Sequence, residues 1–430
     1  MIKKLLWIVC LVACTASAFA QTEPTAYRSV VNRFMLYYNR NQADSVFAMF
    51  GPEAKATMPV EKNRQVLTQL QAQIGGLQQA TFAGMAQNVA TYKADFQKST
   101  LTMKISLAND GKISGLFFDN YQSAKTNVPA AASLGANEMP LSVKTLAGTI
   151  NGTLALPKQA TGKVPVVLIV AASGATDRDG NKPKLNLMPD TYKLLATNLA
   201  QNGIASLRYD KRQVDPTLTA AKEKNMHFSD LVDDAVTLVT QLHDDPRFSK
   251  VVVLGHSEGS LVGMLTCDGQ PVNGFISVEG ESESGDKILM EEAKAQPEFI
   301  RNNLKAVIDT MRKGKVNEVV DPSIYSIART SIQPYLMSWM YIDPIKVIKR
   351  MKQPILLIQG TNDLQVSTAN GEKLKKAKSE AKLVTITGMN YVLRDAPTET
   401  ERNIATYNQP GLPLKPELIT TIVDFVNSLK

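Results

Sequence analysis

The sequence predicts a small α+β domain followed by a larger α/β domain that carries a helical cap. Two observations lead to this prediction. From about residue 138 onward, short apolar runs alternate with amphipathic helical segments, which is typical of a buried parallel sheet covered by helices. Before about residue 120, helical periodicity gives way to alternating apolar and polar residues, as in helices followed by an antiparallel sheet. A chain of 430 residues is long enough for two or three domains.

Residues 1–20 have the features of a secretory signal peptide. Two lysines precede the apolar run Leu5–Ala13, which is too short to span a bilayer. The segment Ala18–Ala20 is a small-x-small cleavage site before Gln21. We therefore expect export to the periplasm or the medium. A lipobox-like segment ending at Cys14 is the alternative, and it would give a lipid-anchored protein.

The composition is that of a globular protein and gives no sign of nucleic-acid or cofactor binding. Hydrophobic residues make up 44% of the chain and charged residues 20%, so a core can form. The net charge is +8, but the basic residues are scattered and no aromatic residues are interleaved with them. The sequence contains no metal-ligand spacing, phosphate-binding glycine loop or dinucleotide fingerprint. We expect no metal and no cofactor, and no membrane span after the signal peptide.

Residues 22–120 are expected to form the N-terminal domain. Apolar residues recur at helical spacing in two segments: Tyr27, Val30, Val31, Phe34 and Tyr38, then Val66, Leu67, Leu70 and Ile74. The segment Leu101–Leu107 alternates as a half-buried strand, and a hairpin turn at Asn109–Gly111 leads into Ile113–Phe118. The pattern resembles the small cone-shaped domains related to nuclear transport factor two, which implies a possible protein partner but no chemistry. The Ala- and Pro-rich stretch 121–137 is expected to be a linker.

Residues 138–430 are expected to form the α/β domain. Six apolar runs are predicted as strands: Val164–Ala171, Ile204–Arg208, Val251–Leu254, Phe275–Val278, Ile355–Ile358 and Leu383–Ile386. Residues 281–349 interrupt the alternation and predict a helical cap over the carboxyl edge of the sheet. Large apolar residues near the end of this segment either line a pocket or pack the cap onto the core: Tyr335, Leu336, Met337, Trp339, Met340 and Tyr341.

A nucleophile motif follows the third of these runs. The apolar residues Val251–Leu254 lead into Gly255–Gly259, which reads Gly-His-Ser-Glu-Gly, and a helical segment comes next. A serine on such a strand–turn–helix connection is exposed at the carboxyl edge of the sheet, and the glycines allow the helix and strand to approach closely. The motif therefore predicts Ser257 as a nucleophile.

Three further segments accompany this motif: Ala172–Asn181, Leu207–Arg212 and Gln359–Val366. With the motif, they make residues 140–430 resemble the bacterial serine α/β-hydrolases of the carboxylesterase type. The resemblance implies that Ser257 is the nucleophile and that the backbone N–H groups of Ser173 and Glu258 form the oxyanion hole. It also implies that Asp363 orients the catalytic base. Two alternative acids follow the preceding strand: Glu279 and Glu281.

The catalytic histidine of this family is missing from its usual place. The resemblance puts a histidine in a Gly-x-Asn-His segment after the last strand, and this chain has Tyr391 there. Of the three histidines, His256 is expected in the core and His243 at the opposite edge of the sheet. His227 lies in a loop on the active-site edge and is the one substitute base we predict. A phenol with a pKa of about 10 is a poor base at neutral pH.

The sequence thus predicts a serine acyl or ester hydrolase acting on a small or medium apolar ester through an acyl-enzyme. Its activity is expected to be weakened by Tyr391. The alternative is an inactive binding protein built on the same fold, because fold does not decide function.

Overall fold

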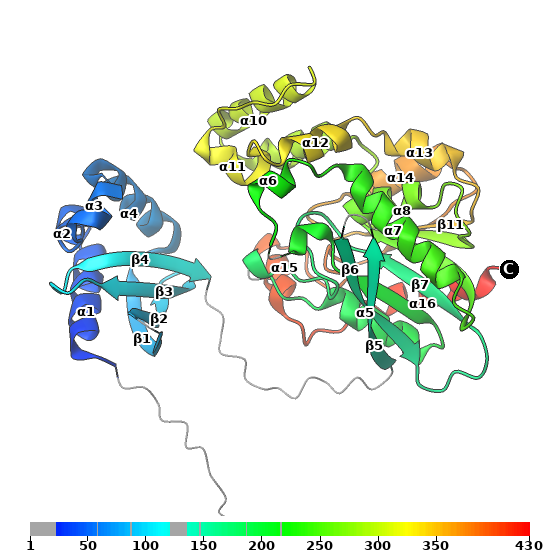
Figure 1. Ribbon diagram of the computed structural model, residues 1–430, viewed down its shortest axis with the longest axis horizontal. Coiled ribbons are helices and arrows are strands. Elements are labelled where there is room, and N and C mark those ends of the chain that lie inside the picture. The colour runs from blue at the N-terminus through cyan, green and yellow to red at the C-terminus, as the bar shows by residue number, and fades with distance from the viewer. Residues whose placement is uncertain are drawn as a thin grey trace, which may run out of the picture. The chain divides into compact units, whose positions relative to one another are not determined.

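The computed structural model describes residues 23–57, 59–86, 88–120, 136–145, 148–185, 187–215 and 217–430 (Figure 1). The expected signal peptide lies outside the described residues, as do residues 121–135 of the expected linker. The chain divides into two compact units, Met1–Asn127 and Val128–Lys430, and each is considered by itself. No helix in the described part of the chain combines the length and apolarity needed to cross a membrane.

The N-terminal unit packs helices against an antiparallel sheet, as the sequence predicted. Its helices are α1 (Thr25–Asn39), α2 (Ala43–Ala48), α3 (Pro52–Thr57) and α4 (Val60–Ile74). Its strands follow in the order β1 (Leu77–Ala86), β2 (Val89–Phe96), β3 (Thr100–Leu107) and β4 (Ile113–Asn120). Apolar residues of α1, including the fully buried Phe34, pack with Met103 and Ile105 of β3. Gly111 supplies the positive φ of +75° that the β3–β4 turn requires.

The second unit contains an eight-stranded sheet with the order β12-β11-β10-β9-β7-β8-β6-β5. The strands are β5 (Ala136–Thr145), β6 (Gly148–Pro157), β7 (Val164–Val170), β8 (Ala205–Tyr209), β9 (Phe248–His256), β10 (Gly274–Val278), β11 (Ile355–Gly360) and β12 (Lys382–Ile386). β5 and β6 form an antiparallel hairpin, β6 is antiparallel to β8, and all later pairings are parallel. This strand order and direction define the α/β-hydrolase fold.

All six predicted strands are present, but the sequence did not predict β5 and β6. Most of β5 is exposed or half-buried, so it lacks the continuous apolar run that marks a central strand. Ala136 and Asn137, which the sequence placed in the linker, lie in β5 and pair with β6.

Helices cover both faces of the large sheet. One face carries α7 (Phe228–His243), α8 (Glu258–Thr266) and α14 (Thr368–Ala377), and the other carries α5 (Thr191–Gln201) and α16 (Pro416–Ser428). Each face has its own apolar cluster, since successive residues of a strand point to opposite sides. Three short helices lie in the loops at the carboxyl edge: α6 (Ala220–Glu223), η2 (Arg212–Val214) and η1 (Pro183–Leu185). Between β12 and α16 lie α15 (Thr400–Ala405) and η5 (Thr406–Asn408).

The predicted helical cap is present between β10 and β11. It consists of α9 (Gly285–Glu292), η3 (Ala293–Ala295), α10 (Glu298–Met311), η4 (Pro322–Ile324), α11 (Tyr325–Ala328), α12 (Gln333–Met340) and α13 (Pro344–Arg350). Figure 1 shows α10, α11 and α12 grouped on one side of this unit. Tyr335, Leu336, Trp339 and Met340 are buried in the same apolar cluster as α7 and α8. They pack the cap onto the core, whereas Tyr341 is 62% exposed.

Candidate active site

The predicted nucleophile, Ser257, occupies a strained turn between β9 and α8. Its backbone has φ 54° and ψ −120°, a conformation that costs energy for a residue with a side chain. The flanking glycines explain how the turn fits. A Cβ on Gly255 would lie 2.1 Å from the Gly259 carbonyl oxygen, and one on Gly259 would lie 2.3 Å from that of Val170. Strand and helix therefore approach closely, and Ser257 stands at the carboxyl edge of the sheet, as the motif predicted. The predicted exposure is wrong, because Ser257 is only 7% exposed.

Two backbone N–H groups beside Ser257 remain available to an oxyanion. Ser173 lies in the loop after β7, and Glu258 is the first residue of α8, where an N–H has no partner within the helix. Neither N–H donates a hydrogen bond within the described part of the chain. These are the two groups that the sequence predicted for the oxyanion hole.

A buried ion pair ties these two segments together. The Lys211 ammonium donates to the Glu258 carboxylate and to the Ala172 carbonyl oxygen, both at 2.8 Å. The Tyr335 hydroxyl, from the cap helix α12, donates to the other Glu258 oxygen at 2.9 Å. Lys211 and Glu258 are almost fully buried. The sequence singled out the segment containing Lys211 but did not predict this role, which depends on contacts between three segments far apart in the chain.

Tyr391 lies beside Ser257, where the resemblance implied a histidine. The phenol is 5% exposed, and its hydroxyl is near enough to the Ser257 hydroxyl to be influenced by it. It forms no hydrogen bond of normal geometry. Burial raises the pKa of Tyr391 well above 10, so the phenol stays neutral at neutral pH. It can donate a hydrogen bond toward Ser257, but it cannot accept the serine proton as an imidazole does.

Asp363, the predicted orienting acid, faces the buried Glu279. One Asp363 oxygen accepts from the N–H groups of Gln365 at 2.6 Å and Val366 at 3.0 Å. One Glu279 oxygen accepts from the Gly360 N–H at 2.7 Å. The remaining oxygen of each carboxyl is buried without a hydrogen bond of normal geometry. Glu279, an alternative acid in the sequence, thus joins Asp363 instead of replacing it.

Burial controls the charge of this carboxyl pair. It raises the pKa of Asp363 to about 6, while Glu279 acts to lower that pKa. It also raises the pKa of Glu279 well above its ordinary value, and the charge of Asp363 adds to that increase. Glu279 therefore holds a proton, and Asp363 carries the negative charge above a pH of about 6. Glu281, the other alternative acid, is also buried, and its pKa rises to about 8 for the same reason.

His256 lies behind the nucleophile as a neutral side chain, as expected for a core histidine. Its Nδ1 lies 2.9 Å from the Tyr192 hydroxyl. Burial, with a contribution from Lys182, lowers the pKa of His256 to about 3. The Tyr391 ring packs against it, with ring centroids 4.8 Å apart.

The structure gives His227 a different role from the predicted substitute base. His227 is the N-cap of α7 and is exposed. Its backbone N–H donates to the Asp230 carboxylate at 2.9 Å, and its Nδ1 lies 3.2 Å from the Asn225 carbonyl oxygen. It therefore caps a helix and has no recorded contact with Ser257. His243 ends the same helix. In the described part of the chain, the ring of His256 bonds to Tyr192 and that of His227 to Asn225, and neither hydrogen bond involves Ser257.

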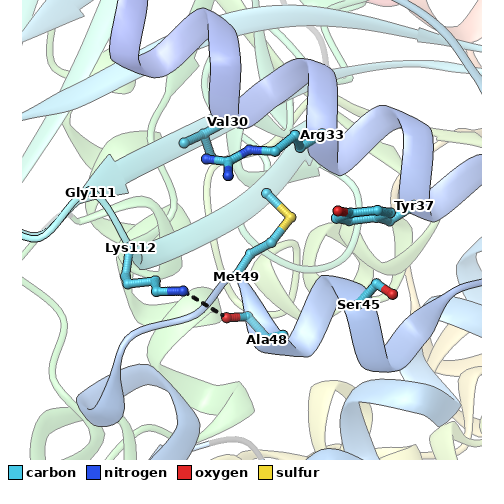
Figure 2. A pocket seen from close by; sticks show the side chains of 8 residues that line it. All are labelled: Val30, Arg33, Tyr37, Ser45, Ala48, Met49, Gly111 and Lys112. Atoms are coloured by element: carbon cyan, nitrogen blue, oxygen red, sulfur yellow. Dashed lines mark hydrogen bonds between the residues drawn. The ribbon is translucent and has the colours of Figure 1, made fainter.

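A separate hollow lies in the N-terminal unit, between α1, α2 and the β3–β4 turn. Its volume is about 250 Å³. Figure 2 shows that it is lined by eight residues: Val30, Arg33, Tyr37, Ser45, Ala48, Met49, Gly111 and Lys112. The Lys112 ammonium donates to the Ala48 carbonyl oxygen at 3.3 Å. This lining contains no nucleophile–base pair, so the catalytic candidates all lie in the second unit. No group of three or more metal-ligating side chains occurs among the described residues.

The chain is similar to a described sequence family, to a known protein and to solved structures. Residues 32–116 match the family described as "Protein of unknown function (DUF3887)". Over 374 residues the chain is 24% identical to Esterase EstD of Thermotoga maritima, covering 84% of this chain and 86% of that protein. Among solved structures, Est1E from Butyrivibrio proteoclasticus is 15% identical with a TM-score of 0.44, over 68% of this chain and 99% of that one. Brefeldin A esterase, a bacterial protein, is 14% identical with a TM-score of 0.45, over 71% and 80%.

Proposed function

We propose that the second unit is a serine ester hydrolase that acts weakly on small or medium apolar esters through a Ser257 acyl-enzyme. One observation carries the proposal: Ser257 is held on a strained turn beside the free N–H groups of Ser173 and Glu258. Strained backbone conformations of this kind cluster at functional sites. The similarity to Esterase EstD along most of both chains supports ester hydrolysis as the class of reaction.

The chemistry would begin with attack of the Ser257 hydroxyl oxygen on the ester carbonyl carbon. The carbonyl oxygen would become an oxyanion, which the N–H groups of Ser173 and Glu258 would stabilise. The alcohol would leave, and water would then release the acid from the acyl-enzyme. The serine proton would pass to water and the leaving alkoxide would take a proton from water, because Tyr391 is a neutral phenol in this protein and does not act as the base.

The missing base sets the expected rate. Enzymes stripped of one triad member lose several orders of magnitude in rate, yet they keep roughly 10³–10⁴-fold acceleration over water through the oxyanion hole and substrate binding. We therefore expect turnover that is measurable but slow. The alternative function is binding without chemistry, which the buried neutral rings of Tyr391 and His256 beside Ser257 favour.

A fluorophosphonate probe tests the proposal directly, since it labels only an activated serine. We expect slow labelling of the full chain at Ser257, identified by peptide mass, together with slow hydrolysis of p-nitrophenyl butyrate. Both should disappear in Ser257→Ala. The control is Ser379→Ala, which changes an exposed serine between α14 and β12 and should leave both signals unchanged. Ester hydrolysis that persists in Ser257→Ala would refute the proposal, and absence of both signals in the wild type would favour the binding function.

A further inference from the structure

The two N–H groups proposed for the oxyanion hole lie on segments that contact each other directly. One segment is the loop after β7, and the other is the start of α8. A Cβ on Gly259, the second residue of α8, would lie 2.6 Å from the carbonyl oxygen of Ala171. The loop and the helix therefore pack backbone against backbone, immediately beside the Ser257 turn.

Both polar backbone groups of Ala172, in that loop, are held by buried side chains. Its N–H donates to the hydroxyl of Tyr192 on α5 at 2.8 Å. Its carbonyl oxygen accepts from the ammonium of Lys211, which follows β8, also at 2.8 Å. Both side chains are buried, and hydrogen bonds are stronger in such a low-dielectric environment. Rotation of the peptide group on either side of Ala172 would break one of them.

The same two side chains bond to the residues on either side of the nucleophile. The Tyr192 hydroxyl forms a hydrogen bond with Nδ1 of His256 at 2.9 Å. The Lys211 ammonium donates to one oxygen of the Glu258 carboxylate at 2.8 Å. Two bridges thus join the loop after β7 to the residue before the nucleophile and to the residue after it.

The cap secures the second bridge. The Tyr335 hydroxyl, from α12, donates to the other oxygen of the Glu258 carboxylate at 2.9 Å. Burial, with a contribution from the charge of Glu258, raises the pKa of Tyr335 well above 10, so this phenol keeps the proton that it donates. Both carboxylate oxygens are therefore occupied, one by Lys211 and one by Tyr335, and the Glu258 side chain is fixed.

The carbonyl that Lys211 holds belongs to the same peptide group as the Ser173 N–H. The peptide bond between Ala172 and Ser173 is trans, so its N–H points opposite to its carbonyl, and the Lys211 contact fixes the direction of both. The Ser173 N–H itself donates no hydrogen bond within the described part of the chain. A donor that is held in place and left unused meets the requirement for a preorganised oxyanion hole.

We propose that Lys211 and Tyr192 are positioning residues of the oxyanion hole, which hold the peptide group between Ala172 and Ser173 in register with the Ser257 turn. This inference rests on the proposed ester hydrolysis, because an oxyanion forms only when an ester is attacked. The effect of both side chains on the reaction passes through the Ser173 N–H. Their loss should therefore lower kcat and leave KM nearly unchanged, as for any interaction made only in the transition state.

The experiment removes each bridge separately and measures hydrolysis of p-nitrophenyl butyrate by the full chain. Tyr192→Phe removes one bridge and keeps the ring, and Lys211→Met/Glu258→Gln removes the other without leaving an unpaired buried charge. We expect each variant to lower kcat about ten- to a hundredfold with little change in KM, because complete loss of an oxyanion donor commonly costs about 10²–10³-fold. Compared with Lys211→Met alone, the double variant should be more stable but no faster, which a purely structural role would not produce.

The matched control is Tyr38→Phe in the N-terminal unit. It also removes a buried tyrosine hydrogen bond, which the Tyr38 hydroxyl donates to the Gly75 carbonyl oxygen at 3.0 Å. This variant should lose stability and keep the wild-type kcat. If Lys211→Met/Glu258→Gln fails to fold, Tyr192→Phe alone decides the outcome.

Crystal structures of the bridge variants separate this inference from the proposed function. If the wild type hydrolyses no ester, but the peptide group between Ala172 and Ser173 turns in the variants, the positioning role stands and the hydrolase proposal fails. If esters are hydrolysed and the variants keep the wild-type kcat, the positioning role is refuted and the hydrolase proposal stands. A peptide group that stays in place in both variants also refutes it, as does a rise in KM at unchanged kcat.

Discussion

The rings of Tyr391 and His256 lie with their centroids 4.8 Å apart, next to the Ser257 turn. The His256 pKa is lowered to about 3 and the Tyr391 pKa is raised well above 10. Neither ring can therefore remove a proton from serine at neutral pH, one because it is too weakly basic and the other because it is never ionised. The charge of Asp363, whose carboxyl faces Glu279, acts on the Tyr391 hydroxyl.

We expect Tyr391→His to raise kcat/KM for p-nitrophenyl butyrate by about ten- to a thousandfold. An imidazole at this position would lie between Ser257 and Asp363, and a well-placed general base commonly contributes about 10²–10⁴-fold. Steady-state kinetics of the purified full chain measures the effect. Tyr391→Phe is the control. Its side chain has no group that could accept the serine proton, so its kcat/KM should equal the wild-type value or lie below it.

His227→Ala is the complementary variant. His227 is exposed, and its contact with Asp230 uses the backbone N–H, which the variant keeps. The substitution should therefore change stability by less than about 0.5 kcal/mol and leave hydrolysis unchanged. A robust wild-type activity that disappears in His227→Ala, with no gain in Tyr391→His, would show that His227 is the base.

Glu281 should make the protein less stable as the pH rises. Its pKa is about 8 in the folded protein, against an ordinary value of 4.5, because it is buried near other carboxyl groups. The folded state therefore holds a proton that the unfolded state releases. The stabilisation is complete below a pH of about 4.5 and is lost as the pH rises through about 8.

We therefore expect the wild-type Tm to fall between about pH 6 and pH 9, and to fall less in Glu281→Gln, which cannot ionise. Thermal unfolding followed by circular dichroism at several pH values measures this. Glu380→Gln, at an exposed carboxylate, should follow the wild type. Parallel curves for the wild type and Glu281→Gln would mean that Glu281 titrates normally.

The buried Lys211–Glu258 pair should be necessary for the stability of the fold near the Ser257 turn. Lys211→Met would leave the Glu258 carboxylate buried without its cation, and breaking such a pair commonly costs about 3–5 kcal/mol. Adding Glu258→Gln to that variant should recover part of the loss. Denaturant unfolding measures both, and Lys287→Met, which breaks the exposed pair with Glu283, should cost less than about 1 kcal/mol. Equal effects of the buried and exposed lysine variants would contradict the assignment.

Limited proteolysis should first cut the chain between about residues 121 and 137. The sequence there is rich in alanine and has few large apolar residues that could form a core. The two fragments should correspond to the two compact units. First cuts within the strands of the large sheet would place the boundary elsewhere.

Export can be tested by the mass of the mature protein. The Ala18–Ala20 site predicts an N-terminus at Gln21. Mass spectrometry of the protein recovered from its native cells should match that start. A mass that corresponds to a lipid-modified Cys14 would favour the anchored alternative.

The sequence alone was sufficient to predict the central strands, the cap and the turn that carries Ser257. Buried parallel strands are continuous apolar runs, so β7 to β12 could be recognised from composition. The motif around Ser257 encodes its own geometry, because only glycine fits at Gly255 and Gly259. The sequence also shows directly that no histidine follows the last strand, where the resemblance implied one and the chain has Tyr391.

Only the tertiary structure decided what surrounds Ser257. The contacts of Lys211 with Glu258 and of Asp363 with Glu279 join residues that are far apart in the chain, and no local pattern specifies such pairs. The edge strand β5 was missed because half of it faces solvent. The protonation states of His256 and Tyr391 depend on desolvation, which is set by the packing of several segments around each ring and not by the residue itself.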